Sequence, residues 1–101
     1  MLPVTGTLPT TEATLYTVIS SRGSTIELVR CVNGGAGQSV VQLWTTVRGL
    51  KAALTPPTPT DIGTLLDAVS DSPVLRLDKG ATISGVATLT GVTFLISGVE
   101  L

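Results

Sequence analysis

Apolar and polar side chains alternate at every second position along much of this chain, which is the period of a β-strand with one buried face. In residues 39–47, Val41 and Leu43 fall on the predicted core side and Trp44 falls on the outer side. Turn-forming residues separate the alternating segments. The pattern predicts strands over residues 13–19, 25–32, 39–47, 74–77, 81–89 and 92–100.

The stretch from Gly80 to Val99 carries no formal charge over the length of a membrane-spanning helix. Hydroxyl side chains recur in it at roughly every second position, whereas a spanning helix is more uniformly apolar. We therefore expect two strands, residues 81–89 and 92–100, joined as a hairpin about Thr90-Gly91.

Several predicted strands are apolar on both sides. Uninterrupted alternation in the second of them places Ile26 and Val29 on opposite sides. Trp44, Leu95 and Val99 lie opposite the predicted core side, where a soluble monomer normally has polar residues. The pattern indicates contact with other subunits, and a third layer formed by the N-terminal segment or the proline-rich segment is the alternative.

Three segments depart from the alternation. Residues 1–12 have two prolines and no clear period, so we expect an extended N-terminal arm that lies on a neighbouring subunit. Residues 50–60 include three prolines, which lack a backbone donor and predict an irregular crossing. Residues 61–70 fit a strand or one short helix, because Ile62, Leu65, Leu66 and Val69 share a helical face.

Length and spacing predict the architecture. Residues 13–101 suit a single domain with one core, and the turns recur at about the 8–12-residue spacing of a sandwich. We expect an all-β fold, an antiparallel β-sandwich or jelly roll of about 7–8 strands with an extended N-terminal arm.

Composition excludes several classes of protein. The chain is 43% hydrophobic and 13% charged, which is too apolar for a disordered segment. Its net charge is −1 and it has no cluster of Lys and Arg, so nucleic acid is not an expected partner. No basic segment followed by an apolar run opens the sequence, and neither a secretory signal nor a membrane partner is expected.

Catalytic chemistry has few candidates. The sequence has no histidine to activate Cys31 or a serine, so we expect no enzyme activity and no catalytic residues. The glycine-rich segment 33–39 lacks the lysine of a phosphate-binding loop and is interpreted as a hairpin connection. The spacing of Asp61, Asp67, Asp71 and Asp78 does not match a calcium loop, so we expect no metal site and no cofactor.

Three stretches of the chain resemble small β-sandwich proteins encoded among the structural genes of tailed bacteriophages. They are Thr11–Val18 (TEATLYTV), Pro73–Ile83 (PVLRLDKGATI) and Val92–Glu100 (VTFLISGVE). Residues 19–23 replace the Pro-Ala-Gly turn of such proteins, and residues 79–81 stand where Gly-Asp is common. Both departures fall in predicted turns and leave the predicted fold unchanged.

The resemblance implies a component of the virion, assembled in the cytoplasm of a bacterial host. The first expectation is a capsid cement or decoration protein that stabilises the head by binding the major capsid protein or other virion proteins, itself a homo-oligomer and most simply a trimer. A small tail, baseplate or head–tail adaptor protein is one alternative, and a carbohydrate-binding module for host attachment is another. The candidate interface residues are Leu2, Val4, Leu8, Trp44, Leu95 and Val99.

Overall fold

The computed structural model describes residues 2–69 and 75–101, which form ten strands and no helix. The strands are β1 (Val4–Thr7), β2 (Ala13–Thr17), β3 (Ser24–Asn33), β4 (Ser39–Val47), β5 (Leu50–Ala53), β6 (Thr58–Thr60), β7 (Leu65–Val69), β8 (Leu75–Leu77), β9 (Thr82–Ala87) and β10 (Val92–Glu100). The predicted all-β class is confirmed.

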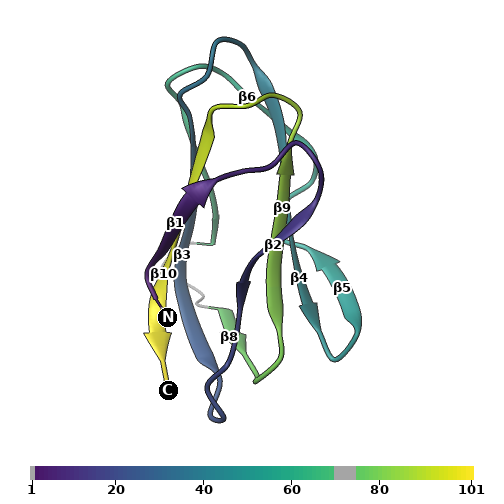
Figure 1. Ribbon diagram of the computed structural model, residues 1–101, viewed down its shortest axis with the longest axis vertical. Helices are drawn as coiled ribbons and strands as arrows, with labels where there is room; N and C mark the ends of the chain where they lie inside the picture. The colour runs from purple at the N-terminus through teal and green to yellow at the C-terminus, as the bar shows by residue number, and fades with distance from the viewer. Residues whose placement is uncertain (1, 70–74) are drawn as a thin grey trace.

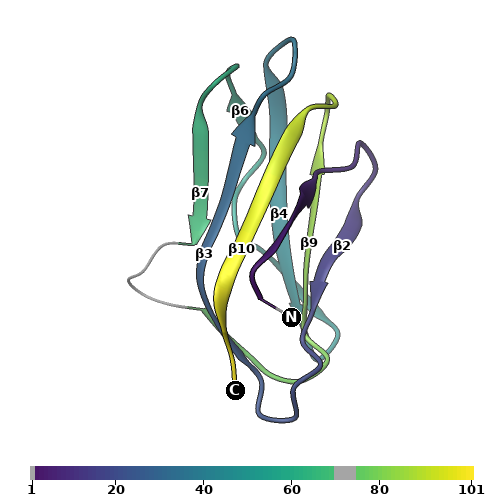
Figure 2. The same ribbon diagram turned by 60° about the vertical axis from the view of Figure 1, so that its left-hand side comes forward.

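The strands form two antiparallel sheets that pack face to face as a β-sandwich. Sheet A has the order β1-β10-β3-β7, and β8 also pairs with β3. Sheet B has the order β2-β9-β4-β5, and β6 also pairs with β4. Figure 1 shows the two sheets edge-on as facing layers, and Figure 2 looks onto sheet A with β7, β3, β10 and β1 side by side.

Strand pairing is nested about the middle of the chain. β1 pairs with β10, β2 with β9, β3 with β7 and β8, and β4 with β5 and β6. The pairs β3–β10 and β4–β9 then complete the two sheets. Near both ends of the chain, strands that are neighbours in sequence consequently lie in opposite sheets, as β1 and β2 or β9 and β10 do.

The predicted hairpin about Thr90-Gly91 is therefore wrong, although both of its strands exist. β9 lies in sheet B and β10 in sheet A, so the turn crosses from one sheet to the other. The segment 33–39 makes a second crossing, from β3 to β4, and is not a hairpin connection either. The two crossings bond to each other: Gly34 N–H donates to Gly91 O at 3.0 Å and Thr88 N–H donates to Val40 O at 3.1 Å.

Asn33 fixes the first crossing from inside the protein. Its side chain is fully buried, and its Nδ2 donates to Gly37 O and Thr60 O, each at 2.8 Å. Its Oδ1 accepts from Gly35 N–H at 2.9 Å, which closes the turn locally. One amide thus ties the glycine-rich loop to the end of β6.

The core lies between the sheets and is made of aliphatic side chains from both. The predicted core sides of β4 and β10 are confirmed, since Val41, Leu43, Val92 and Ile96 are fully buried.

A bulge in β3 overturns the predicted sides of that strand, because Ile26, Val29 and Cys31 are all fully buried. Ser97 pairs with Leu28 and Gly98 pairs with Ile26, which leaves Glu27 as an extra residue that shifts the alternation by one position.

The N-terminal segment belongs to the domain, which corrects the prediction of a separate arm over residues 1–12. β1 pairs with β10 along its whole length, from Val4 opposite Ile96 to Thr7 opposite Thr93. Leu8 is only 1% exposed, and its N–H donates to Val92 O at 2.7 Å. The segment completes an edge of sheet A because β10 otherwise lacks a partner there.

The proline-rich segment is also more regular than predicted. β5 and β6 both pair with β4, and Pro59 lies opposite Val40. Proline is tolerated because β6 is an edge strand and its missing donor costs no sheet bond.

The sequence predicts either a strand or a short helix for residues 61–70. The strand is confirmed as β7 over Leu65–Val69, and a turn at Ile62-Gly63 precedes it. The strand predicted at residues 74–77 is confirmed as β8, while residue 74 and the turn predicted at residues 71–73 lie outside the described residues. Within residues 2–69 and 75–101 no helix is long and apolar enough to span a membrane.

Candidate functional site

The outer face of sheet A carries two rows of side chains that run across its strands. Strand register places Thr5, Leu95, Arg30 and Asp67 next to one another on β1, β10, β3 and β7. The adjacent row consists of Thr7, Thr93, Val32 and Leu65. On the two middle strands, β10 and β3, this face carries the apolar Leu95 and Val32 beside Thr93 and Arg30. Threonines lie at the β1 edge, and Asp67 and Leu65 lie at the β7 edge.

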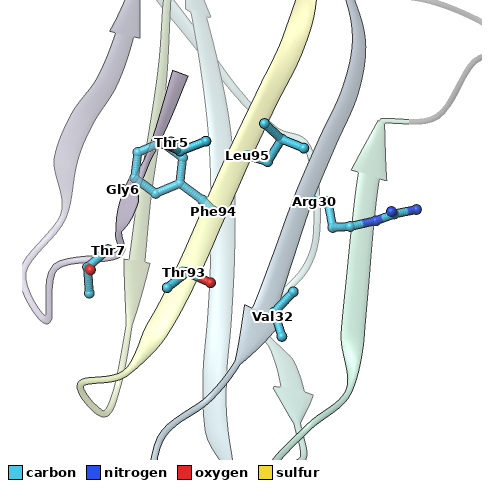
Figure 3. A pocket seen from close by; sticks show the side chains of 8 residues that line it. All are labelled: Thr5, Gly6, Thr7, Arg30, Val32, Thr93, Phe94 and Leu95. Carbon is cyan, nitrogen blue, oxygen red and sulfur yellow. The ribbon is translucent and has the colours of Figure 1, made fainter. Parts of the chain in front are cut away.

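A hollow of about 460 Å³ lies between these rows (Figure 3). It is lined by Thr5, Gly6, Thr7, Arg30, Val32, Thr93, Phe94 and Leu95. The ring of Phe94 lies beside Gly6, and a Cβ atom at Gly6 would come within 2.9 Å of that ring. Glycine at this position therefore lets the aromatic ring cover the β1 backbone.

Arg30 lines one side of the hollow and forms an ion pair with Asp67 through two hydrogen bonds. Arg30 Nε donates to Asp67 Oδ1 at 2.7 Å, and Nη2 donates to Oδ2 at 3.0 Å. Figure 3 shows the Arg30 side chain extended away from Leu95 toward β7. The hydrogen bond and charge of Arg30 lower the pKa of the Asp67 carboxyl, and Asp67 raises the pKa of Arg30 in turn. Because the two charges neutralise each other, the hollow presents an uncharged, mainly apolar surface.

The predicted interface residues are distributed over three places. Leu95 lines the hollow, and Val99, which is 50% exposed, lies on the same face of β10. Leu2 and Val4 are half-buried and pack against the core. Leu8 is wrong as an interface residue because the core encloses it.

Trp44 lies on the outer face of sheet B, away from the hollow. Its cross-strand neighbours Ser84 and Ala53 are small and leave room for the indole. Lys51 Nζ lies 4.4 Å from the ring centroid, within the range of a cation–π contact. The same ammonium group donates to Glu12 Oε2 at 2.6 Å, so it holds Glu12 and Trp44 together. One face of the indole is therefore already occupied by a residue of the chain itself.

Groups with catalytic or metal-binding potential are dispersed. Cys31 is fully buried, and burial, with a smaller effect from Asp67, raises the pKa of its thiol to about 12. Asp61 accepts from Gln38 Nε2 at 2.7 Å, Asp67 pairs with Arg30 and Asp78 pairs with Arg48. Asp71 lies outside the described residues. Among the residues that the structure does describe, no three metal-ligating side chains come together.

Arg30, Val32 and Thr93 were absent from the candidate interface. Alternation along each strand is visible in the sequence, but the register that brings three strands into one surface is not. The sequence did offer one signal for this surface. Val32 is apolar and lies two positions after Arg30, so both side chains fall on the same face of β3.

Comparison of the chain with protein-family models, with curated protein sequences and with solved structures finds no match in any of the three.

Proposed function

We propose that this chain is a structural protein of a tailed-bacteriophage virion, a capsid cement or decoration protein whose copies associate with one another through the outer face of sheet A. The observation that carries the proposal is the uncharged hollow around Leu95, which is an apolar surface on a sheet face that faces away from the core. Apolar side chains exposed together on an outward-facing sheet surface are one feature of sites that bind another protein.

The nested strand pairing supports the proposal at the level of fold. The short strands β7 and β8 share one edge of sheet A, and β5 and β6 share one edge of sheet B. If each of these pairs is counted as one strand, the chain is a single long antiparallel ribbon that is folded into two sheets. A nested pairing of this kind supports the jelly roll that we propose for this chain, a fold used by viral capsid proteins among others. Fold analogy alone does not establish function, so the sheet A surface remains the deciding feature.

The occupant that we propose for this surface is a second copy of the chain, in a trimer that attaches to the shell. Charge complementarity favours a neutral, apolar partner surface, because Arg30 and Asp67 already satisfy each other. The outer face of sheet A in the second copy is such a surface. A contact between two such faces buries little unpaired charge.

Replacing Leu95 with Glu tests the proposal. The charge would be desolvated in the interface, so light scattering is expected to show a monomer that keeps the circular dichroism of a β-protein. Gln42→Glu on the half-buried outer face of sheet B is the matched control and is expected to leave the oligomer intact. An oligomer that survives Leu95→Glu contradicts the proposed surface.

Electron microscopy of virions containing the protein tests its location. We expect density at regular lattice positions on the head. Density in the tail or at the head–tail junction, with far fewer copies, would favour the adaptor alternative instead. A glycan-binding role has less support, because Lys51 covers one face of Trp44 and Phe94, the aromatic residue that lines the hollow, is only 8% exposed.

A further inference from the structure

A second hollow lies at one end of the sandwich, where the turns after β2, β4 and β8 come together (Figure 1, lower end). Its volume is about 350 Å³. It is lined by Ser21, Arg22, Val47, Arg48, Asp78, Lys79 and Ala81. This hollow is separate from the surface around Leu95, since the two share no residue.

Positive charge is concentrated in this end hollow. It is lined by three of the six Lys and Arg residues of the chain and by one of its seven Asp and Glu residues. The local excess is two positive charges in a protein whose net charge is −1. Cations gathered around one concavity raise the local concentration of anions.

The single carboxylate does not use up the cations. Asp78 Oδ2 accepts one hydrogen bond from Arg48 Nη2 at 3.0 Å, which leaves the other guanidinium donors of Arg48 available. The side chains of Arg22 and Lys79 have no partner among the residues that the structure describes. The side chains of Arg22 and Lys79 and the remaining donors of Arg48 are therefore available to a ligand.

The β4–β5 turn holds Arg48 in a left-handed conformation that this type of turn requires and that arginine disfavours. Arg48 has φ 54° and Gly49 has φ 79°, so both central residues of the β4–β5 turn are left-handed. Asn-Gly is the usual pair in such a turn, and arginine is disfavoured at its first position. Arginine in place of the usual asparagine puts a guanidinium group at the rim of the hollow.

The turns that carry the other two cations are joined to one another. Gly80 N–H donates to Val18 O at 2.8 Å, and Val18 N–H donates to Ala81 O at 2.9 Å. Gly23 N–H donates to Ser20 O at 3.0 Å and closes the turn that holds Arg22. A frame fixed by backbone bonds reduces the ordering cost of binding.

We infer that the end hollow between Arg22, Arg48 and Lys79 binds a multiply charged oxyanion, either a phosphate or a group of carboxylates. Arginine offers paired donors that match two oxygens of such a group, and lysine adds a compact positive charge. This inference is independent of the docking role of sheet A.

The test is a titration of the ¹⁵N-labelled protein with inorganic phosphate and, separately, with citrate, followed by NMR. We expect saturable shifts confined to residues 20–23, 47–49 and 78–81. Saturation with phosphate identifies the phosphate form of the ligand, and saturation with citrate alone identifies the carboxylate form. Absence of saturable shifts with both anions overturns the inference.

Variants separate a site from general attraction of anions. Arg22→Gln and Arg48→Asn are each expected to weaken binding by about tenfold or more. Asparagine suits the left-handed position, so Arg48→Asn is expected to fold normally by circular dichroism. Arg76→Gln removes an exposed cation of β8 that does not line the hollow, and it is the matched control. Equal loss of affinity in Arg76→Gln and Arg22→Gln would also overturn the inference.

Discussion

The hydroxyl oxygens of Tyr16 and Ser24 lie 2.7 Å apart and join the two sheets through the buried interior. Tyr16 belongs to β2 in sheet B and Ser24 to β3 in sheet A. Both residues are buried, at 4% and 0% exposure, so neither hydroxyl has bulk water as an alternative partner.

Tyr16→Phe is expected to lower the free energy of unfolding by about 1–3 kcal/mol, because it leaves the Ser24 hydroxyl buried without its partner. Urea denaturation measures the change. The double variant Tyr16→Phe/Ser24→Ala removes both polar groups and is expected to recover part of the loss. If the two single losses simply add in the double variant, the bond between the hydroxyls is not the cause.

Asn33→Ala is expected to destabilise the protein by about 2–3 kcal/mol, since it removes three hydrogen bonds from a fully buried site. Thermal and urea unfolding both measure this. Gln38→Ala changes an exposed side chain in the same loop and is expected to remain within about 0.5 kcal/mol of the parent. Similar losses in the two variants would argue against a central role for the Asn33 amide.

Gly98→Ala is expected to cost about 1–3 kcal/mol, because a Cβ atom there collides with the carbonyl oxygen of Thr25 at the β3 bulge. Ser97→Ala, at the adjacent half-buried position, is the control and is expected to have little effect. A stable Gly98→Ala protein would mean that the bulge at Glu27 relaxes easily.

The Arg30–Asp67 pair predicts a pH-dependent contribution to stability. The pKa of Asp67 in the folded protein lies below its ordinary value of 3.8, so the pair stabilises the fold at higher pH and is lost as the pH falls through the lowered pKa. The parent is therefore expected to be slightly more stable than Asp67→Asn at neutral pH, with the difference vanishing in acid. Both side chains are partly exposed, so added salt is expected to reduce the difference. A difference that persists at low pH contradicts this account.

Cys31 is expected to resist alkylation in the folded protein. Its thiol is fully buried, and its pKa of about 12 leaves almost no thiolate at pH 8. Iodoacetamide labelling followed by mass spectrometry is expected to show a slow reaction that becomes fast in denaturant. Rapid labelling without denaturant would show that β3 opens readily.

Local pattern was sufficient for much of the fold. The period-two alternation in residues 39–47 predicts both the strand and its buried side, because a side chain's direction in a strand depends only on its position parity. The same logic fails in β3. The bulge at Glu27 arises from the way β3 pairs with β10, and the sequence of β3 alone does not indicate it.

The partners of strands and the candidate site depend on distant residues. Thr90-Gly91 indicates that the chain turns, but not that β10 enters the opposite sheet. Leu95 was identifiable from its outward position. Arg30 and Asp67 are 37 residues apart in sequence, and only the β3–β7 register brings them together beside it.

The nested pairing also determines when the domain can fold during synthesis. β10 lies between β1 and β3 in sheet A, and it is the last of the described strands to leave the ribosome. Until then β1 has no partner strand and one edge of β3 is open, so the growing chain exposes unpaired backbone to other chains. Pairings between strands so distant in sequence also close slowly. A nascent chain that stalls before residue 92 is thus expected to be prone to aggregation.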